Sequence, residues 1–295
     1  MDVFAQFLVN GLVAGSVYAL IALGFALIFT ASRVFHFAHG AVYTLSAFAG
    51  YTALVVLGLG TVGGFLAAIV TAVVLGLAIN RMFYEPMRDL GVSSFVTMIL
   101  SFGLLIIITH LTAMVWGTNP VVLWRGGQET VHALGPVRIT GRQLGIVALA
   151  ALLGASLWAF FRFFRLGIAL RALGNDSDLA QIVGMPARGL RQLSFALGSG
   201  LVGISAMLIG FNVGIIDFNM GFDVILMATV AMIIGGLGNV SAAAGGGFAL
   251  GIIQNVALWK IDSKWQMALS FAILILVLLF RPSGLFGERQ SAVGL

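Results

Sequence analysis

The chain has 295 residues, of which 60% are hydrophobic and only 8% are charged, and its mean hydropathy is +1.11. A water-soluble core of this length could not bury so much apolar surface, so the composition excludes a soluble globular protein and indicates a polytopic membrane protein. The net charge of +5 comes from basic residues between apolar stretches, without interleaved aromatic residues, so we expect anionic lipid headgroups and no nucleic acid as partners.

Apolar stretches of helical length recur along the whole chain. They predict an all-α fold with about eight or nine transmembrane helices, the count depending on a weakly marked turn at Gly58–Gly64. The first stretch is too long for the apolar part of a cleavable signal, so it is predicted to span the membrane. In chain order the predicted spans are Gln6–Phe29, Ala41–Leu57, Phe65–Asn80, Val92–Trp116, Leu144–Phe161, Leu193–Val213, Asp223–Ile234, Phe248–Trp259 and Gln266–Phe280.

Three connections between the spans have a distinctive composition. Arg81–Gly91 is predicted to be a short charged loop, and Thr118–Arg142 a longer polar connection in which Val137–Thr140 is extended. Gly235–Gly247 contains six glycines. It is consistent with a gate hinge between helices or, equally, with a tight hairpin of two packed helices.

The longest strongly polar stretch is Arg162–Arg191, which carries five arginines. Within it, Asp176–Val183 is predicted to form a short helix, which Asn175 or Asp176 can cap at its start and Gly184 can end. A short helix flanked by arginines is typical of a docking site for a soluble partner. A solvated loop that only sets the topology would have the same composition.

The basic residues also predict an orientation. If this central loop faces the cytoplasm and the spans alternate, ten of the 15 basic residues lie inside and five lie outside, in agreement with the positive-inside rule. The inside group is Arg33, Arg81, Arg88, Arg162, Arg165, Arg171, Arg188, Arg191, Arg281 and Arg289. This orientation places the C-terminus in the cytoplasm and the N-terminus outside.

Motifs for catalysis or for energising transport are missing from the sequence. There is no phosphate-binding loop, because neither of the two lysines follows a glycine-rich turn, and there is no nucleophile elbow or zinc-protease motif. Few acids lie within the predicted spans, so we expect no enzymatic chemistry, and no cofactor, in this chain.

Two histidines, His36 and His39, stand three residues apart and would share one face of a helix. They could bind a metal or gate a path by protonation, but no Asp, Glu or Cys stands nearby to complete a metal site. We therefore prefer hydrogen-bonded histidines at a helix bend. Asp223 is expected to cap the helix that it begins.

A faint internal repeat is present. Phe37–Gly40 and Phe218–Gly221 share an F-x-x-G step between two apolar spans, and a Gly-Leu-Val step precedes each. The spacings differ by several residues. If the repeat is real, the chain has two similar halves around a central path, as in many transporters.

Taken together, five stretches resemble the permease subunits of ABC importers for branched-chain amino acids, the Liv type, and more closely the shorter member of the permease pair. The resemblance covers nearly the whole chain. The five stretches are Asn10–Phe29, Phe37–Gly40, Arg171–Leu208, Phe218–Gly251 and Leu278–Gly287.

This resemblance implies a single permease domain over residues 1–295 in the inner (plasma) membrane of the cell, with an ATPase-docking loop at about 162–192. It also implies a second, usually different, permease, two cytoplasmic ATPases that bind ATP and Mg²⁺, and a periplasmic binding protein. In such importers a coupling helix in the main cytoplasmic loop holds the ATPase. The broader permease class has an E-A-A motif and a later glycine there, and the leading pattern is looser in this family. Here only Ala180 and Gly184 match that motif. The coupling residues implied are Asp176, Asp178, Ala180, Gly184 and Arg188.

The resemblance further implies a solute path between the two permeases, lined by apolar and small polar groups. The predicted lining residues are Asn10, Ser16, Tyr18, Phe37, His39, Thr44, Ser46, Thr97 and Ser101, with Asn219 at the outer mouth. Leucine, isoleucine and valine are the expected solutes. Other amino acids, urea and short amides are alternatives. A free-standing channel or secondary carrier is the competing function, and it would move solute without an ATPase.

Overall fold

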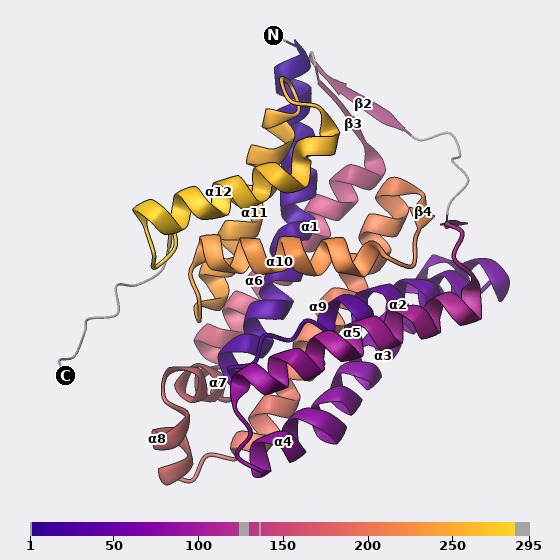
Figure 1. Ribbon diagram of the computed structural model, residues 1–295. Coiled ribbons are helices and arrows are strands. Elements are labelled where there is room, and N and C mark those ends of the chain that lie inside the picture. The colour runs from indigo at the N-terminus through magenta and orange to yellow at the C-terminus, as the bar shows by residue number, and fades with distance from the viewer. Residues whose placement is uncertain (1, 124–129, 136, 287–295) are drawn as a thin grey trace. The chain divides into compact units, whose positions relative to one another are not determined.

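The computed structural model describes residues 2–123, 130–135 and 137–286 (Figure 1). Its described residues are mostly helical, with four very short strands. The helices are α1 (Asp2–Ser32), α2 (His39–Tyr51), α3 (Gly60–Ile79), α4 (Glu85–Asp89), α5 (Ser94–Trp116), α6 (Gly141–Phe163), α7 (Arg165–Asn175), α8 (Ser177–Ile182), α9 (Ala187–Val213), α10 (Met220–Gly235), α11 (Val240–Ala257) and α12 (Gln266–Phe280). The strands are β1 (Val121–Val122), β2 (Val131–Leu134), β3 (Val137–Thr140) and β4 (Ile215–Ile216).

Seven helices among the described residues are long and apolar enough to cross a membrane, and α10 is a shorter apolar helix. The predicted all-α, polytopic membrane fold is therefore confirmed. The chain divides into two compact units. Unit 1 takes its residues from 1–26, 130–154 and 227–295, and unit 2 from 27–129 and 155–226.

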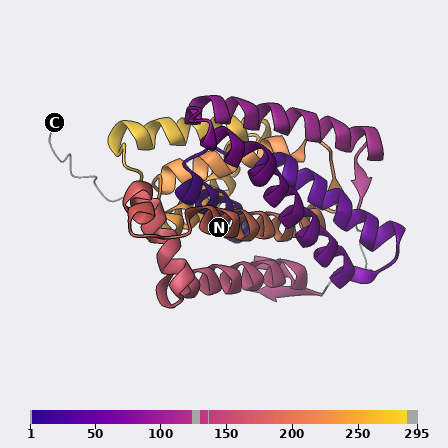
Figure 2. The same ribbon diagram turned by 90° about the horizontal axis from the view of Figure 1, so that it is seen from below.

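Unit 2 is built around α2, α3 and α9, and Figures 1 and 2 both show α2 and α3 side by side. Small residues at every fourth position of α3 make this packing close, because residues four apart share one face of a helix. That face consists of Gly64, Ala68, Ala72 and Gly76, all buried. The opposite face of α3 carries exposed Val62, Leu66, Val70 and Val74, as expected of a surface in contact with lipid or another subunit.

The contact of α9 with α3 predicts a measurable steric effect. A Cβ atom at Gly203 would lie 2.7 Å from the Ala68 carbonyl oxygen, whereas at Gly200, on the same helix, it would meet only the Val73 Cγ2 atom, at 3.6 Å. Both Gly→Ala changes raise helix propensity equally. We expect Gly203→Ala to be less stable than Gly200→Ala by about 1–3 kcal/mol, the usual cost of overpacking. Thermal unfolding of the two variants in detergent measures this difference, and equal midpoints would contradict the packing.

Two helices of unit 2 end at glycines and lead into a small strand pair. Gly117 follows α5 with φ +88°, and Gly214 follows α9 with φ +86°. Both values lie in the region that favours glycine. Beyond them β1 pairs with β4 in antiparallel register, Val121 opposite Ile216. This pairing fixes the chain just before α10 begins.

In unit 1, α1 and α11 approach closely through glycines. A Cβ atom at Gly251 would lie 2.3 Å from the Gly15 Cα atom, so neither position accepts a larger residue without moving the helices apart. The β2–β3 hairpin is held to α1 by Gln6. The Gln6 amide donates to the Arg138 carbonyl oxygen at 2.9 Å and accepts the Arg138 N–H at 2.8 Å. The predicted extended stretch Val137–Thr140 is confirmed as β3.

Two predicted connections are wrong in part. Most of Arg81–Gly91 is helical, because α3 continues through a π-helical segment (Asn80–Tyr84) into α4. Pro86 is the second residue of α4 and follows the π-helical segment almost directly.

The loop predicted at about 162–192 is also shorter than expected, because it contains α7, and α9 already begins at Ala187. In the glycine-dense segment Gly235–Gly247, only residues 236–239 lie outside helices. Asn239 caps α11 by accepting the Ala242 N–H. The segment is therefore a tight helix–helix hairpin, one of its two predicted alternatives.

Candidate functional site

The short helix predicted in the central loop is present as α8. Asp176 has an extended backbone, and its carboxylate accepts the N–H groups of Asp178 at 3.0 Å and Leu179 at 2.8 Å. At the other end Gly184 has φ +82°, and the Met185 N–H donates to the Ala180 carbonyl oxygen. The cap and the stop signal therefore work as the sequence predicts.

The cap predicts a local loss of order in one variant. Asp176→Ala removes the acceptor for two free N–H groups and should cost α8 about 1 kcal/mol, whereas Asp176→Asn keeps an acceptor oxygen. Amide hydrogen exchange over residues 177–183 should accelerate several-fold in Asp176→Ala and change little in Asp176→Asn. Equal exchange in both variants would show that the cap does not stabilise α8.

α8 exposes apolar side chains beside the polar Asp178 and Gln181. Ala180 is buried, whereas Leu179 is 55% exposed and Ile182 is 81% exposed, with Val183 exposed next to them. We call Leu179, Ile182 and Val183 the α8 apolar patch. Such a patch on a helix of only six residues, between arginine-rich segments, is a candidate contact surface for a protein partner.

The segment before α8 is anchored to the end of α1. The Arg33 guanidinium donates to the Gly174 carbonyl oxygen at the end of α7. Gly174 also packs directly on Thr30, where a Cβ atom would have no room. The base of α8 is therefore attached to a membrane-spanning helix rather than to a free loop.

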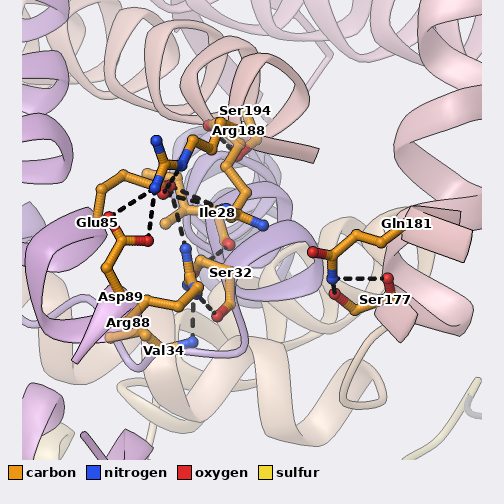
Figure 3. A network of polar contacts seen from close by, with 11 residues as sticks. Ile28, Ser32, Val34, Glu85, Arg88, Asp89, Ser177, Gln181, Arg188 and Ser194 are labelled. Atoms are coloured by element: carbon orange, nitrogen blue, oxygen red, sulfur yellow. Dashed lines mark hydrogen bonds and ion pairs between the residues drawn. The ribbon is translucent and has the colours of Figure 1, made fainter. Parts of the chain in front are cut away.

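The segment after α8 is anchored by ion pairs, which Figure 3 shows around Glu85, Asp89 and Arg188. The Arg191 guanidinium donates twice to the Glu85 carboxylate, from Nε at 2.7 Å and from a terminal nitrogen at 3.1 Å, and both side chains are buried. Arg188 pairs with Asp89 at 2.6 Å nearer the surface. We call these residues, with Arg88, the α4–α9 ion-pair cluster.

Arg88 extends this cluster to α1. Its guanidinium donates to Glu85 at 3.1 Å and to the Ser32 carbonyl oxygen at 2.9 Å. Ser32 is the last residue of α1, so its carbonyl oxygen has no acceptor role within the helix.

Of the predicted coupling residues, Asp176, Asp178, Ala180 and Gly184 lie on or at the ends of α8, whereas Arg188 belongs to the ion-pair cluster. Sequence reasoning missed Glu85 and Asp89. The signal available was two acids four residues apart at the end of an apolar stretch otherwise poor in acids.

A second polar cluster is buried inside unit 2. His36 Nδ1 lies 2.7 Å from the Tyr84 hydroxyl, which donates to the Ser101 Oγ atom at 2.7 Å. Ser101 also accepts the Ala38 N–H at 2.9 Å. His36 lies outside any helix and His39 begins α2, with their rings 5.5 Å apart. Among the described residues, no group of three His, Cys, Asp or Glu could hold a metal ion.

The predicted path residues fall into both units. Asn10, Ser16 and Tyr18 lie on α1 in unit 1, and the remaining seven lie in unit 2. Most are buried, and several hydroxyls bond within their own helix, such as Ser46 to the Tyr43 carbonyl oxygen. Phe37 is partly exposed and Asn219 is exposed. The path role of the whole set stays a prediction.

The two F-x-x-G steps of the sequence meet in unit 2. Gly40 and Gly221 are in backbone contact, because a Cβ atom at Gly40 would lie 2.4 Å from the Gly221 carbonyl oxygen. The Gly221 N–H donates to the Thr44 Oγ1 atom at 3.1 Å. Each step ends in the first turn of a helix, α2 or α10. The two-half repeat itself stays a prediction.

Comparisons with known proteins agree with this fold. The sequence model of the family described as "Branched-chain amino acid transport system / permease component" matches residues 7–278. The chain is 30% identical to the high-affinity branched-chain amino acid transport system permease protein LivH of Escherichia coli, over 97% of this chain and 96% of that protein. It is also 30% identical to the permease protein BraD of Pseudomonas aeruginosa, over 97% of both chains. A chain of PsaBC from Streptococcus pneumoniae has the same fold, with a TM-score of 0.52 and 16% identity over 95% of this chain and 93% of that one.

Proposed function

Because this chain belongs to the family of permease components of branched-chain amino acid transport systems, we propose that it is the membrane-spanning permease subunit of an ABC importer. Its solutes are leucine, isoleucine, valine or closely related amino acids, by analogy with the names of the relatives. The chain has no catalytic role. ATP and Mg²⁺ bind in separate ATPase subunits, and their hydrolysis cycle drives the alternation of the permease between its two access states.

The single observation that carries this proposal is the placement of α8. It presents the α8 apolar patch outward while both of its ends are tied to membrane-spanning helices, through Arg33 before it and through Arg191 after it. A partner that moves α8 therefore pulls on α1, α4 and α9 directly. This is the arrangement that a subunit without its own energy source needs in order to be driven by a soluble ATPase.

The other partners follow from the same assignment. We propose a second permease, usually a different chain, two ATPases on the side of α8, and a solute-binding protein on the opposite side. The membrane is the bacterial inner membrane, with the arginine-rich side of the chain and the C-terminus facing the cytoplasm.

Affinity purification of the tagged chain from mild detergent, with mass spectrometry of the co-purifying proteins, tests this function. ATPase subunits should co-purify with the native chain and be lost from a still-folded variant in which residues 176–184 are replaced by a neutral linker. A folded native chain that retains no ATPase under conditions in which the second permease stays bound would overturn the proposal.

A further inference from the structure

Three phenylalanines from separate parts of the sequence form a row in unit 2. Phe37 precedes α2, Phe102 lies on α5, and Phe222 lies in the first turn of α10. The ring centroids of Phe37 and Phe102 are 6.1 Å apart and those of Phe102 and Phe222 are 6.5 Å apart, both in edge-to-face geometry. Phe102 is 41% exposed and Phe222 is 42% exposed, so the row has a free face in this chain. We call it the aromatic row.

The depth of the aromatic row follows from α5. Phe102 is the ninth residue of this 23-residue span, so it lies about 12 Å along the helix axis from the first residue, Ser94. The hydrocarbon core of a bilayer is about 30 Å thick, and Phe102 therefore lies within it rather than at its edge. Phe37 and Phe222 contact Phe102 and must lie at a similar depth.

The backbone beside the aromatic row is not helical. Residues 33–38 separate α1 from α2, and residues 217–219 precede α10. Gly40 and Gly221 hold these two breaks together, and the Gly221 N–H is paired with Thr44. Of the residues in these two breaks, Phe37 is partly exposed and Asn219 is exposed.

Lipid is a poor cover for this surface. Hydrocarbon offers no hydrogen-bond partners, so irregular backbone occurs at membrane depth only where protein covers it or where it lines a water-containing path. Interrupted helices at corresponding positions of two similar segments are also where transporters place their solute sites. The free face of the aromatic row therefore differs from the exposed valine face of α3, which lies on an unbroken helix.

We propose that Phe37, Phe102 and Phe222 form the part of the transport path that contacts the apolar side chain of a branched-chain amino acid, with Asn219 beside them for its polar end. This assignment rests on the proposed function. Rigid aromatic rings offer an apolar surface that matches a branched aliphatic side chain. The Asn219 amide has both donors and an acceptor, and so can meet either an ammonium or a carboxylate group. Sequence reasoning had identified Phe37 and Asn219 but neither Phe102 nor Phe222.

The absence of cysteine from the sequence allows a direct test. Single Phe102→Cys and Phe222→Cys variants are reconstituted with the partner subunits and treated with a membrane-impermeant methanethiosulfonate, which reacts with thiolates in water. Val70→Cys, on the unbroken α3, is the matched control, and the unsubstituted complex gives the background from the partners. Phe102→Cys and Phe222→Cys should both be modified at least about tenfold faster than Val70→Cys. Excess leucine should slow their modification.

Two results would overturn the proposal. Modification no faster than at Val70→Cys would mean that lipid or a partner covers the row, and fast modification that leucine does not slow would mean that the solute passes elsewhere. ATP-driven leucine uptake by the unsubstituted complex, measured in the same vesicles, separates these outcomes from a failure of the proposed function.

Selectivity gives a second readout that does not depend on thiol chemistry. Phe102→Ala should lower the ratio of leucine to alanine uptake efficiency by about tenfold, because the larger apolar side chain loses more contact. Phe102→Leu, which keeps an apolar surface, should restore most of that ratio. An unchanged ratio in a folded Phe102→Ala complex would exclude Phe102 from the contact with the solute side chain.

Discussion

Glu85→Gln should lower the free energy of unfolding of the purified protein by about 3–5 kcal/mol, the range typical of breaking a buried ion pair from one side. Glu85 accepts two hydrogen bonds from buried Arg191 and one from Arg88. The substitution keeps the size of the side chain but leaves two guanidinium groups without their common counter-charge. Thermal unfolding in detergent, followed by tryptophan fluorescence, measures the loss.

Asp89→Asn is the matched control for this prediction. Asp89 is an acid of the same cluster, but its pair with Arg188 is exposed, with side-chain exposures of 66% for the arginine and 52% for the aspartate. Exposed pairs contribute at most about 1 kcal/mol. The double variant Glu85→Leu/Arg191→Met should recover part of the stability lost in Glu85→Gln, because both buried charges of the pair are removed. Equal losses of unfolding free energy in Glu85→Gln and Asp89→Asn would contradict the role of Glu85 as the buried counter-charge of Arg191.

Leu179→Ser/Ile182→Ser should reduce ATP-driven uptake by the reconstituted complex at least about tenfold. Leu179 is 55% exposed and Ile182 is 81% exposed, and in the proposed complex they are apolar contacts that a docked ATPase would cover. Removing two well-buried interface side chains costs binding about 2–4 kcal/mol, which is roughly a thirtyfold to several-hundredfold loss of affinity. Uptake and the amount of ATPase bound should therefore fall together.

Gln181→Ala is the control for the α8 variant. The Gln181 amide bonds to Ser177 within α8, so this change alters the helix surface without removing the α8 apolar patch. It should leave uptake within about twofold, since exposed polar residues at the edge of an interface contribute little to binding. A folded Leu179→Ser/Ile182→Ser complex with normal uptake would show that the ATPase is coupled elsewhere.

Features set by short stretches of sequence could be predicted. The capped helix α8 was predicted within one residue at each end, because Asp176 and Gly184 act locally on the backbone. The spans at α5 and α12 also agree closely, since long apolar stretches need no tertiary information.

Features that depend on contacts between distant residues could not be predicted from the sequence. Arg81–Gly91 looked like a loop because its charges are unfavourable in a membrane, but Arg191, 106 residues after Glu85, neutralises one of them. The segment Gly235–Gly247 left a hinge and a helix–helix hairpin equally open, and the close contact of Gly246 with Gly235 in unit 1 favours the hairpin. The contacts of Phe102 with Phe37 and with Phe222 likewise have no signature in the sequence.

The central claim is that this chain transports solute only when a separate ATPase drives it. The most direct measurement is uptake of radiolabelled leucine into vesicles that contain either the chain with its second permease alone or the complete complex with the binding protein and ATPases. Uptake should require the complete complex, with ATP on the side of the vesicle membrane that α8 faces. Concentrative or rapid leucine entry into vesicles without the ATPases would instead show a channel or a secondary carrier.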